Sequence, residues 1–238
     1  MMGKVIMSGI VPQLTVPQVP GIALADIAEG SIVKIKENGV PVEFYVVKHV
    51  YESGLNGAGR TLLLRKGCYN KQPWSSDYVD SYISSTIDSW LNSTYKALLD
   101  AKCQEAIATT AFYVRASRTS ATNISLSRSI FLLAASEVKS LDTEDADYYV
   151  PEETMESPLS TVSVWRSAYY QGILTAWWTR SIHLDTDRNY SICVRDKDGS
   201  SGPINGDYQS TNNGIRPCFT LPATAIFDEE TLVLKGVA

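Results

Sequence analysis

Two stretches near the end of the chain decide its fold: Trp178-Thr179-Arg180-Ser181 and Gly214-Ile215-Arg216-Pro217-Cys218-Phe219-Thr220-Leu221. Each combines an arginine with large apolar residues, and the segment between them consists mostly of Asp, Asn, Ser, Gly, Tyr and Arg. Rigid strands that hold a hydrophilic loop between them are a common way for a fold to present binding residues. The pattern therefore predicts two structural anchors with a binding surface at about residues 177–213.

The composition is that of a globular protein with an acidic balance. The chain has 238 residues, of which 44% are hydrophobic and 10% aromatic, and its formal net charge is -5. This length fits one large domain, or one domain with a short appendage. The many tyrosines suit binding surfaces because each ring carries a polar group. No nucleic-acid partner is expected, since the sequence has no basic run that would bind phosphate.

Neither a secretory signal nor a membrane-spanning segment is expected. The start has one lysine and no sustained apolar core, and no apolar run approaches the roughly 20 residues of a membrane helix. The cysteines, Cys68, Cys103, Cys193 and Cys218, include no CxxC pair. We therefore expect no zinc or other metal site, no cofactor and four free thiols. Cys193 and Cys218 are the one pair for which a bridge stays open.

Alternating apolar and polar residues predict several strands. Ile32 to Lys36 alternates, Asn38-Gly39 favours the positive φ angles of a tight hairpin turn, and Val42 to Val47 is the return strand. Leu62 to Leu64 is a third, buried strand. Further strands are predicted at 112–114, 130–133, 190–195, 215–221 and 231–234. We expect the strands near 190–195 and 215–221 to share one sheet.

Two helices are predicted in the middle of the chain. Ser85 and Asp88 have the spacing of a capping box, and apolar residues at helical spacing follow as far as Leu99. A second, short helix is predicted from Ala101 to Ala108. Residues 136–140 fit a helical turn, and residues 165–174 fit a helix or a turn. The whole pattern is mixed α+β, with short strands outnumbering helices.

The domain limits follow from composition. Pro12, Pro17 and Pro20 indicate an extended arm, which we assign to residues 1–29. The folded domain is assigned to residues 30–222, and residues 223–238 to a C-terminal strand or tail. Residues 141–160 are acidic and lack Lys and Arg, and their spacing is not that of a calcium loop. They are predicted to form a solvated surface loop.

No sequence motif predicts catalysis. Gly54 to Thr61 approaches the phosphate-binding loop pattern, but Arg60 replaces the lysine and a strand, not a helix, follows. No GxSxG elbow is present, and the many acidic residues single out no pair for glycoside hydrolysis. Cys193 and Cys218 are interpreted as buried, inert thiols. We therefore expect no catalytic residue and no enzyme activity.

Several motifs occur in an order that resembles a known domain. They are Trp90-Leu91-Asn92, then Phe131-Leu132-Leu133 followed by Glu137, and finally the two anchors around Arg180 and Arg216. Over about residues 30–222 the chain resembles a domain of unknown function that is widespread in gut Gram-positive bacteria and their phages; Ala134 stands where its second motif has serine. The two anchors are also similar to the C-type lectin-like fold of variable proteins diversified by retroelements and of formylglycine-generating enzymes, although the catalytic cysteine context of the latter is not matched.

The resemblance implies a fold, a role and partners. The fold is α+β and C-type lectin-like, with small mixed or antiparallel sheets and two helices. The role is receptor binding in a phage or prophage tail that is assembled in the host cytoplasm. The implied partners are a bacterial surface protein or glycan and other phage tail proteins, and a homo-oligomer stays open. Residues 182–192 are largely of the types that adenine-directed mutation of Asn codons produces, which fits a segment diversified by a retroelement.

The candidate ligand contacts are aromatic and short polar residues between the two anchors, a mixture that gives contact area and adaptable hydrogen bonds. They are Trp177, His183, Asp185, Asp187, Arg188, Asn189, Tyr190, Asp207, Tyr208 and Asn212. Trp178, Arg180 and Arg216 are assigned to the scaffold instead, with each guanidinium bound to backbone carbonyls or a carboxylate. Two other functions stay open: a structural tail or baseplate component, and an enzyme that acts on surface glycans.

Overall fold

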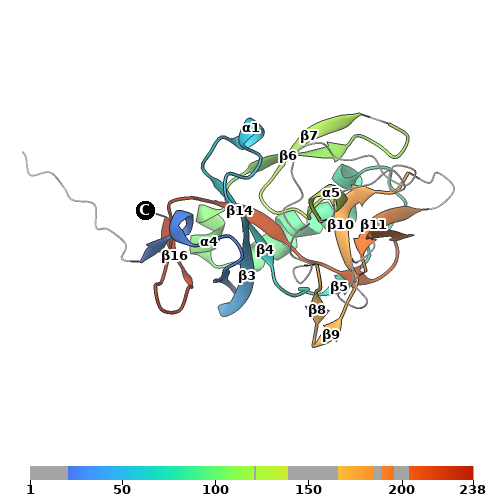
Figure 1. Cartoon of the computed structure of the whole chain (residues 1–238). Helices are drawn as coiled ribbons and strands as arrows, with labels where there is room; N and C mark the ends of the chain where they lie inside the picture. Colours follow the sequence, from blue (N-terminus) through green and yellow to red (C-terminus); the bar gives the residue numbers. More distant parts are fainter. Residues whose placement is uncertain (1–20, 121, 139–165, 185–188, 196–203, 238) are drawn as a thin grey trace, which may run out of the picture.

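The computed structural model describes residues 21–120, 122–138, 166–184, 189–195 and 204–237. Within them the chain is α+β, as predicted: several small, mostly antiparallel sheets are accompanied by short helices. Figure 1 shows the sheets following one another across the molecule. The sheet that contains both ends of the described chain lies on the left, a four-stranded sheet is central, and a five-stranded sheet lies on the right.

The central sheet has the strand order β14-β4-β3-β2 and forms much of the core. It contains β2 (Ile32–Glu37), β3 (Val40–Lys48), β4 (Arg60–Arg65) and β14 (Cys218–Pro222). The predicted hairpin is confirmed, because β2 pairs with β3 through a turn in which Asn38 and Gly39 have φ angles of 48° and 80°. The ring centroids of Phe44 and Phe219 lie 5.3 Å apart within this core.

The two ends of the described chain meet in a three-stranded sheet. Strand β1 (Ile22–Ala23) pairs with β15 (Ala225–Phe227), which pairs with β16 (Leu234–Val237). A 3-10 turn, η1 (Leu24–Asp26), follows β1 and buries Leu24. Gly21 has a φ of 152°, and a Cβ there would lie 2.3 Å from the carbonyl oxygen of Phe227. The part of the expected arm that follows residue 21 thus packs into the domain.

The five-stranded sheet carries the predicted binding region. Its order is β12-β11-β10-β13-β5, with β10 (Trp177–Ile182) at its centre. The other strands are β5 (Lys71–Gln72), β11 (Tyr190–Val194), β12 (Ile204–Tyr208) and β13 (Asn213–Gly214). All pairs are antiparallel except β10 with β13, which is parallel.

The expectation that residues 190–195 and 215–221 share a sheet is wrong. Gly214 pairs with Trp177 in the five-stranded sheet, whereas Cys218 pairs with Leu64 in the central sheet. The chain crosses between the two sheets at Ile215-Arg216-Pro217, and the regular strand begins only at Cys218. Proline lacks the N–H that a continuous ladder needs, so Pro217 suits a crossing point.

The predicted helix after Ser85 is confirmed. A 3-10 turn, η2 (Tyr82–Ser84), precedes it. It runs as α2 (Thr86–Trp90), a π segment η3 (Leu91–Tyr95) and α3 (Lys96–Leu98). The Ser85 hydroxyl accepts a hydrogen bond from the Asp88 amide at 3.2 Å, which is the predicted cap. The second helix is α4 (Ala101–Ala106), capped by the Asp100 carboxylate.

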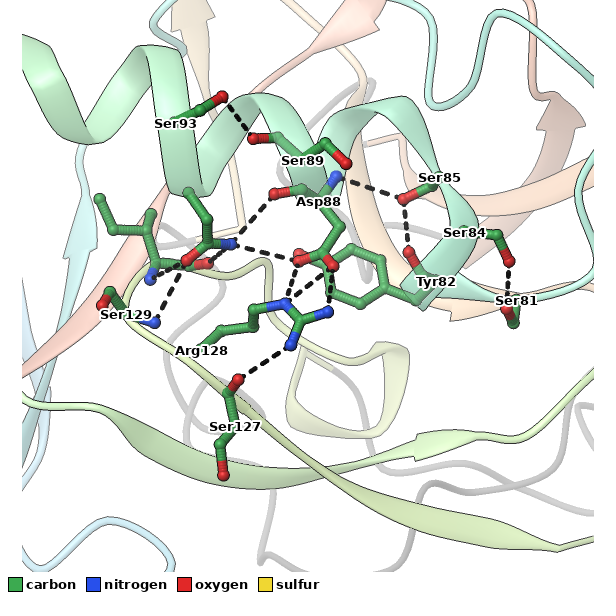
Figure 2. A network of polar contacts seen from close by, with 12 residues as sticks. Ser81, Tyr82, Ser84, Ser85, Asp88, Ser89, Ser93, Ser127, Arg128 and Ser129 are labelled. Carbon is green, nitrogen blue, oxygen red and sulfur yellow. Dashed lines mark hydrogen bonds and ion pairs between the residues drawn. The ribbon is translucent and has the colours of Figure 1, made fainter.

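Residue Asp88 also anchors this helix to the rest of the domain. Figure 2 shows the Arg128 guanidinium against the Asp88 carboxylate, at the end of strand β7 (Asn123–Arg128). The Asn92 amide adds bonds to the backbone of Ser129 and Ile130. Burial raises the pKa of Asp88, and Arg128 opposes this shift. Asn92 of the Trp90-Leu91-Asn92 motif thus fixes the helix to the segment that follows β7.

Three sequence predictions need correction. Residues 130–133 are not a strand: they form a buried irregular segment in which Phe131 makes one bridge to Cys218. A short apolar run that is buried on all sides has no periodicity by which to assign it. Residues 169–174, predicted as a helix or a turn, form a turn at 171–172 between two short strands that were not predicted, β8 (Tyr169–Tyr170) and β9 (Ile173–Leu174). The final strand begins at Leu234 rather than Thr231.

The remaining short elements agree better with the sequence. Strand β6 (Thr110–Arg115) contains the predicted strand at 112–114 and pairs with β7, which was not predicted. The helical turn is α5 (Ala135–Val138), and the glycine-rich loop contains the four-residue α1 (Ser53–Asn56) and leads into strand β4. The acidic loop predicted at residues 141–160 lies outside the described residues, as do residues 1–20.

All four cysteines are buried free thiols in the structure. Burial raises the pKa of Cys68 and of Cys193 to about 11. At pH 8 the reactive thiolate is then on the order of a thousandth of each population. We expect a thiol reagent such as Ellman's reagent to modify the native chain very slowly at pH 8. In denaturant without reductant it should titrate four thiols, and a titre of two would contradict the assignment.

Candidate functional site

Strand β10 forms the floor of the candidate site and is buried along its whole length. The Trp178 indole N–H donates to the Gln72 carbonyl, and the Thr179 hydroxyl donates to the Ile192 carbonyl. Trp177 was predicted to contact ligand, but it is only 1% exposed and its indole N–H donates to the Arg166 carbonyl. The structure thus places Trp177 in the interior with Trp178, because a fully buried strand presents neither face to solvent.

The Arg180 guanidinium lies at the centre of a buried polar network. It forms a bidentate ion pair with Glu137, with distances of 2.7 and 3.0 Å, and also donates to the Leu132 and Tyr113 carbonyls. The Tyr51 hydroxyl donates to the same carboxylate, and burial raises the pKa of Tyr51. The motif that ends at Glu137 and the anchor around Arg180 are distant in sequence, yet their side chains are direct partners.

The same two motifs meet a second time through Ser181. Its hydroxyl accepts a hydrogen bond from the Ala135 amide at 2.9 Å, at the start of α5. The Arg180 guanidinium also lies over the Phe112 ring, at 4.7 Å from the centroid. Strand β10 is therefore bound to α5 and to β6, and this holds the end of β10 in place beneath the candidate surface.

Residue Arg216 has the same kind of role at the crossing between the sheets. It is fully buried, its guanidinium lies 4.7 Å from the Trp177 ring centroid, and its Nε donates to the Arg65 carbonyl. Burial lowers the pKa of Arg216 to about 10, so the side chain remains a cation at neutral pH. Planar stacking on a tryptophan is a contact that guanidinium makes well and lysine does not.

Replacing Arg216 should therefore destabilise the fold. In Arg216→Ala the Arg65 carbonyl loses a buried donor, which costs about 1–3 kcal/mol, and a cavity adds to this. Arg216→Lys should lose less, because lysine keeps a hydrogen-bond donor and most of the side-chain volume, although it loses the contact with the Trp177 ring. Urea unfolding of the two variants and the parent measures the effect. Equal midpoints for Arg216→Ala and the parent would contradict this role.

Three aromatic rings follow one another at the ends of β10, β11 and β12. Tyr190 and Tyr208 are directly opposite each other in the ladder, and their rings meet edge to face at 4.6 Å. The His183 ring meets the Tyr190 ring at 5.7 Å and 90°. Exposure increases along the series, because His183 is 7% exposed, Tyr190 is intermediate and Tyr208 is 51% exposed. Tyr208 is thus open to a ligand, Tyr190 is partly open, and His183 is covered.

Gly206 makes room for this packing. A Cβ at this position would lie 2.6 Å from Cδ2 of His183 and 3.1 Å from Cδ2 of Tyr190. We expect Gly206→Ala to displace both rings and to shift the ring signals of His183 in a carbon–proton NMR spectrum. The chain has two histidines, so His49 serves as the internal control. Unchanged His183 signals would show that the three rings do not pack as described.

Asp207 lies on the opposite face of β12 from these rings. Neighbouring residues of a strand point to opposite faces, and Asp207 is opposite Ser191 rather than Tyr190. Its carboxylate accepts hydrogen bonds from Arg195 at 2.6 Å, Asn213 at 3.0 Å and Thr211 at 3.1 Å. Although partial burial opposes ionisation, these bonds lower the pKa of Asp207. Asp207 therefore fixes the turn after β12, rather than extending the aromatic series.

The other predicted contacts divide into two groups. Asn189 and Asn212 are exposed beside Tyr190 and after Tyr208, respectively. Asp185, Asp187 and Arg188 lie outside the described residues. Of the ten predicted contacts, the structure thus brings together His183, Asn189, Tyr190 and Tyr208, with Asn212 nearby in the chain. We call Tyr78, Asn189, Tyr190 and Tyr208 the tyrosine surface.

Tyr78 joins this surface from a distant part of the sequence. The Arg118 guanidinium lies 5.3 Å from the Tyr78 ring centroid and donates to the carbonyls of His183 and Tyr190. Neither Tyr78 nor Arg118 was predicted from the sequence as part of the site. No motif surrounds Tyr78, and its partner Arg118, which is 1% exposed, connects it to the β10–β11 end of the sheet.

Within the described residues no group of three His, Cys, Asp or Glu side chains is placed to hold a metal ion. None of the described helices is both long and apolar enough to cross a membrane.

The comparisons with known proteins identify a family. A family model described as a domain of unknown function, DUF6273, matches residues 58–223, and the chain belongs to this family. No curated protein and no solved structure matches the chain. The match covers the helix after Ser85, the Glu137–Arg180 network and the crossing at Arg216.

Proposed function

We propose that this chain is a receptor-binding protein of a phage or prophage tail, and that the tyrosine surface contacts a ligand on the bacterial surface. The observation that supports this most is the aromatic series that ends in the 51% exposed Tyr208. Exposed tyrosine offers large, amphipathic contact area at a low entropy cost when its ring is already held in place. Its partners would be a bacterial surface protein or glycan and other tail proteins.

The proposal includes a C-type lectin-like architecture. It is supported by the coarse class, small antiparallel sheets with short helices, and by the two arginine anchors on either side of the polar segment. In this account the chain has no catalytic role, and the buried arginine of each anchor has a structural partner: Arg180 binds Glu137, and Arg216 donates to the Arg65 carbonyl. Diversification of residues 177–213 by a retroelement is part of the same proposal, and a near-repeat of their coding segment beside a reverse transcriptase gene would support it.

Binding to whole cells tests the proposed function. The purified, fluorescently labelled chain is mixed with a panel of gut Gram-positive bacteria, and cell-bound fluorescence is measured against concentration. We expect saturable binding to a subset of strains, competed by unlabelled chain, with heat-unfolded chain as the control. Absence of saturable binding to every strain, combined with stable assembly onto purified tail proteins, would favour a purely structural component instead.

A further inference from the structure

Two exposed tyrosines lie in neighbouring segments of the folded chain. Tyr208 is 51% exposed and Tyr78 is 49% exposed. Val79 follows Tyr78, Gln209 follows Tyr208, and the two are joined by a pair of hydrogen bonds. The Gln209 side-chain amide accepts from the Val79 N–H at 3.2 Å and donates to the Val79 carbonyl at 3.0 Å. The Gln209 amide nitrogen also donates to the Ser191 hydroxyl. The two rings are thus attached to one rigid junction.

Each of the two rings is supported from beneath. The Tyr190 ring holds Tyr208 edge to face, and the buried Arg118 guanidinium lies against Tyr78. Arg118 and Tyr190 are themselves joined, since Arg118 donates to the Tyr190 carbonyl at 3.0 Å. A ligand that packs on both rings therefore meets side chains whose rotamers are already restricted, which reduces the entropy cost of binding.

The residues around the rings are neutral amides and carboxylates. Asn189 and Asn212 are exposed close to Tyr190 and Tyr208 in the chain, and Asp77 and Asp80 are exposed next to Tyr78. A hydrogen bond to Asp80 raises the pKa of Tyr78. The nearest cations we describe are engaged, because Arg118 lies beneath Tyr78 and Arg195 binds Asp207. The rim therefore offers hydrogen-bond groups and negative charge.

Resting on the receptor-binding function proposed above, we propose that the tyrosine surface binds an uncharged glycan through stacking on Tyr78 and Tyr208. A sugar ring has an apolar C–H face that packs on an aromatic ring, and hydroxyls that suit amide and carboxylate partners. The exposed Asp77 carboxylate repels a phosphate or carboxylate polymer, and Arg118 lies 3.9 Å from the Asp80 carboxylate, so the charge of Asp80 is already balanced. The net charge of -5 acts in the same direction as Asp77. A protein partner would need about 800 Å² of complementary surface, far more than two rings supply.

Treated cells distinguish the ligand classes. Strains that bind the labelled chain are treated with protease or with periodate, which cleaves vicinal diols of sugars. We expect binding to survive protease and to be lost after periodate. Neutral cell-wall polysaccharide from the same cells should compete, and polyglycerol phosphate should not. Loss after protease alone, or competition by polyglycerol phosphate alone, would overturn the glycan proposal while leaving receptor binding intact; absence of binding to untreated cells would instead overturn the proposed function.

Single variants test the two stacking positions. Tyr78→Ala and Tyr208→Ala should each weaken binding to the neutral polysaccharide at least about tenfold. Tyr169→Ala is the matched control, since Tyr169 is 54% exposed but lies on the β8–β9 hairpin. Its binding should equal that of the parent. Because all three rings are exposed, melting curves should stay close together, and parental affinity of Tyr78→Ala would show that its ring is not a stacking position.

Discussion

Arg180→Ala should lose about 3–5 kcal/mol of unfolding free energy, because it leaves the Glu137 carboxylate buried without its cationic partner. Both side chains are at most 2% exposed, so water does not replace the lost bonds. The Leu132 carbonyl loses a donor in the same change. The measurement is urea unfolding of the parent and the variant, monitored by circular dichroism.

Two further variants make this prediction decisive. Lys66→Ala removes a surface ion pair with Glu43, whose side chains are 41% and 47% exposed, and should cost no more than about 1 kcal/mol. Glu137→Gln retains an acceptor for Tyr51 while removing the charge, so its loss of unfolding free energy should lie between those of the other two variants. It also provides a measurable unfolding free energy if Arg180→Ala does not fold. An Arg180→Ala variant within about 0.5 kcal/mol of the parent would contradict the role of the network.

The sequence predicted local structure where one physical signal dominates. Period-two alternation with Asn38-Gly39 predicted the β2–β3 hairpin, and Ser85 predicted the start of the helix. Residues 130–133 could not be assigned in this way, because their burial depends on Asn92 and Cys218, which lie far away in the chain. The choice of sheet for residues 215–221 likewise depends on pairing with β4, which periodicity does not encode.

The candidate site was predictable only in part, for the same reason. The composition of the segment after β10 indicated Tyr190 and Tyr208, and the ladder places them opposite each other. It could not show that Trp177 is covered by Arg216, or that Asp207 points to the other face of β12. Tyr78 joins the surface through Arg118, a contact between residues that no local pattern connects.

The two motifs around Arg180 and Arg216 build the scaffold, and the tyrosine surface is a separate feature at its edge. The double variant Tyr190→Ala with Tyr208→Ala should therefore separate binding from stability. Two contact residues that each contribute about 1.4 kcal/mol or more predict at least about a hundredfold loss of affinity. Loss of the half-buried Tyr190 ring should cost about 1 kcal/mol of stability, which corresponds to about 2–4 °C in melting temperature.

The most direct test of this account is the affinity of that double variant for a bacterial strain that binds the parent chain, measured well below the melting temperatures of both. The control is the double variant Tyr169→Ala with Ile173→Ala, which removes two exposed apolar side chains from the β8–β9 hairpin. The account predicts that cell binding is lost in the first variant and retained in the second, with both chains folded. Parental binding by a folded Tyr190→Ala, Tyr208→Ala chain would contradict it.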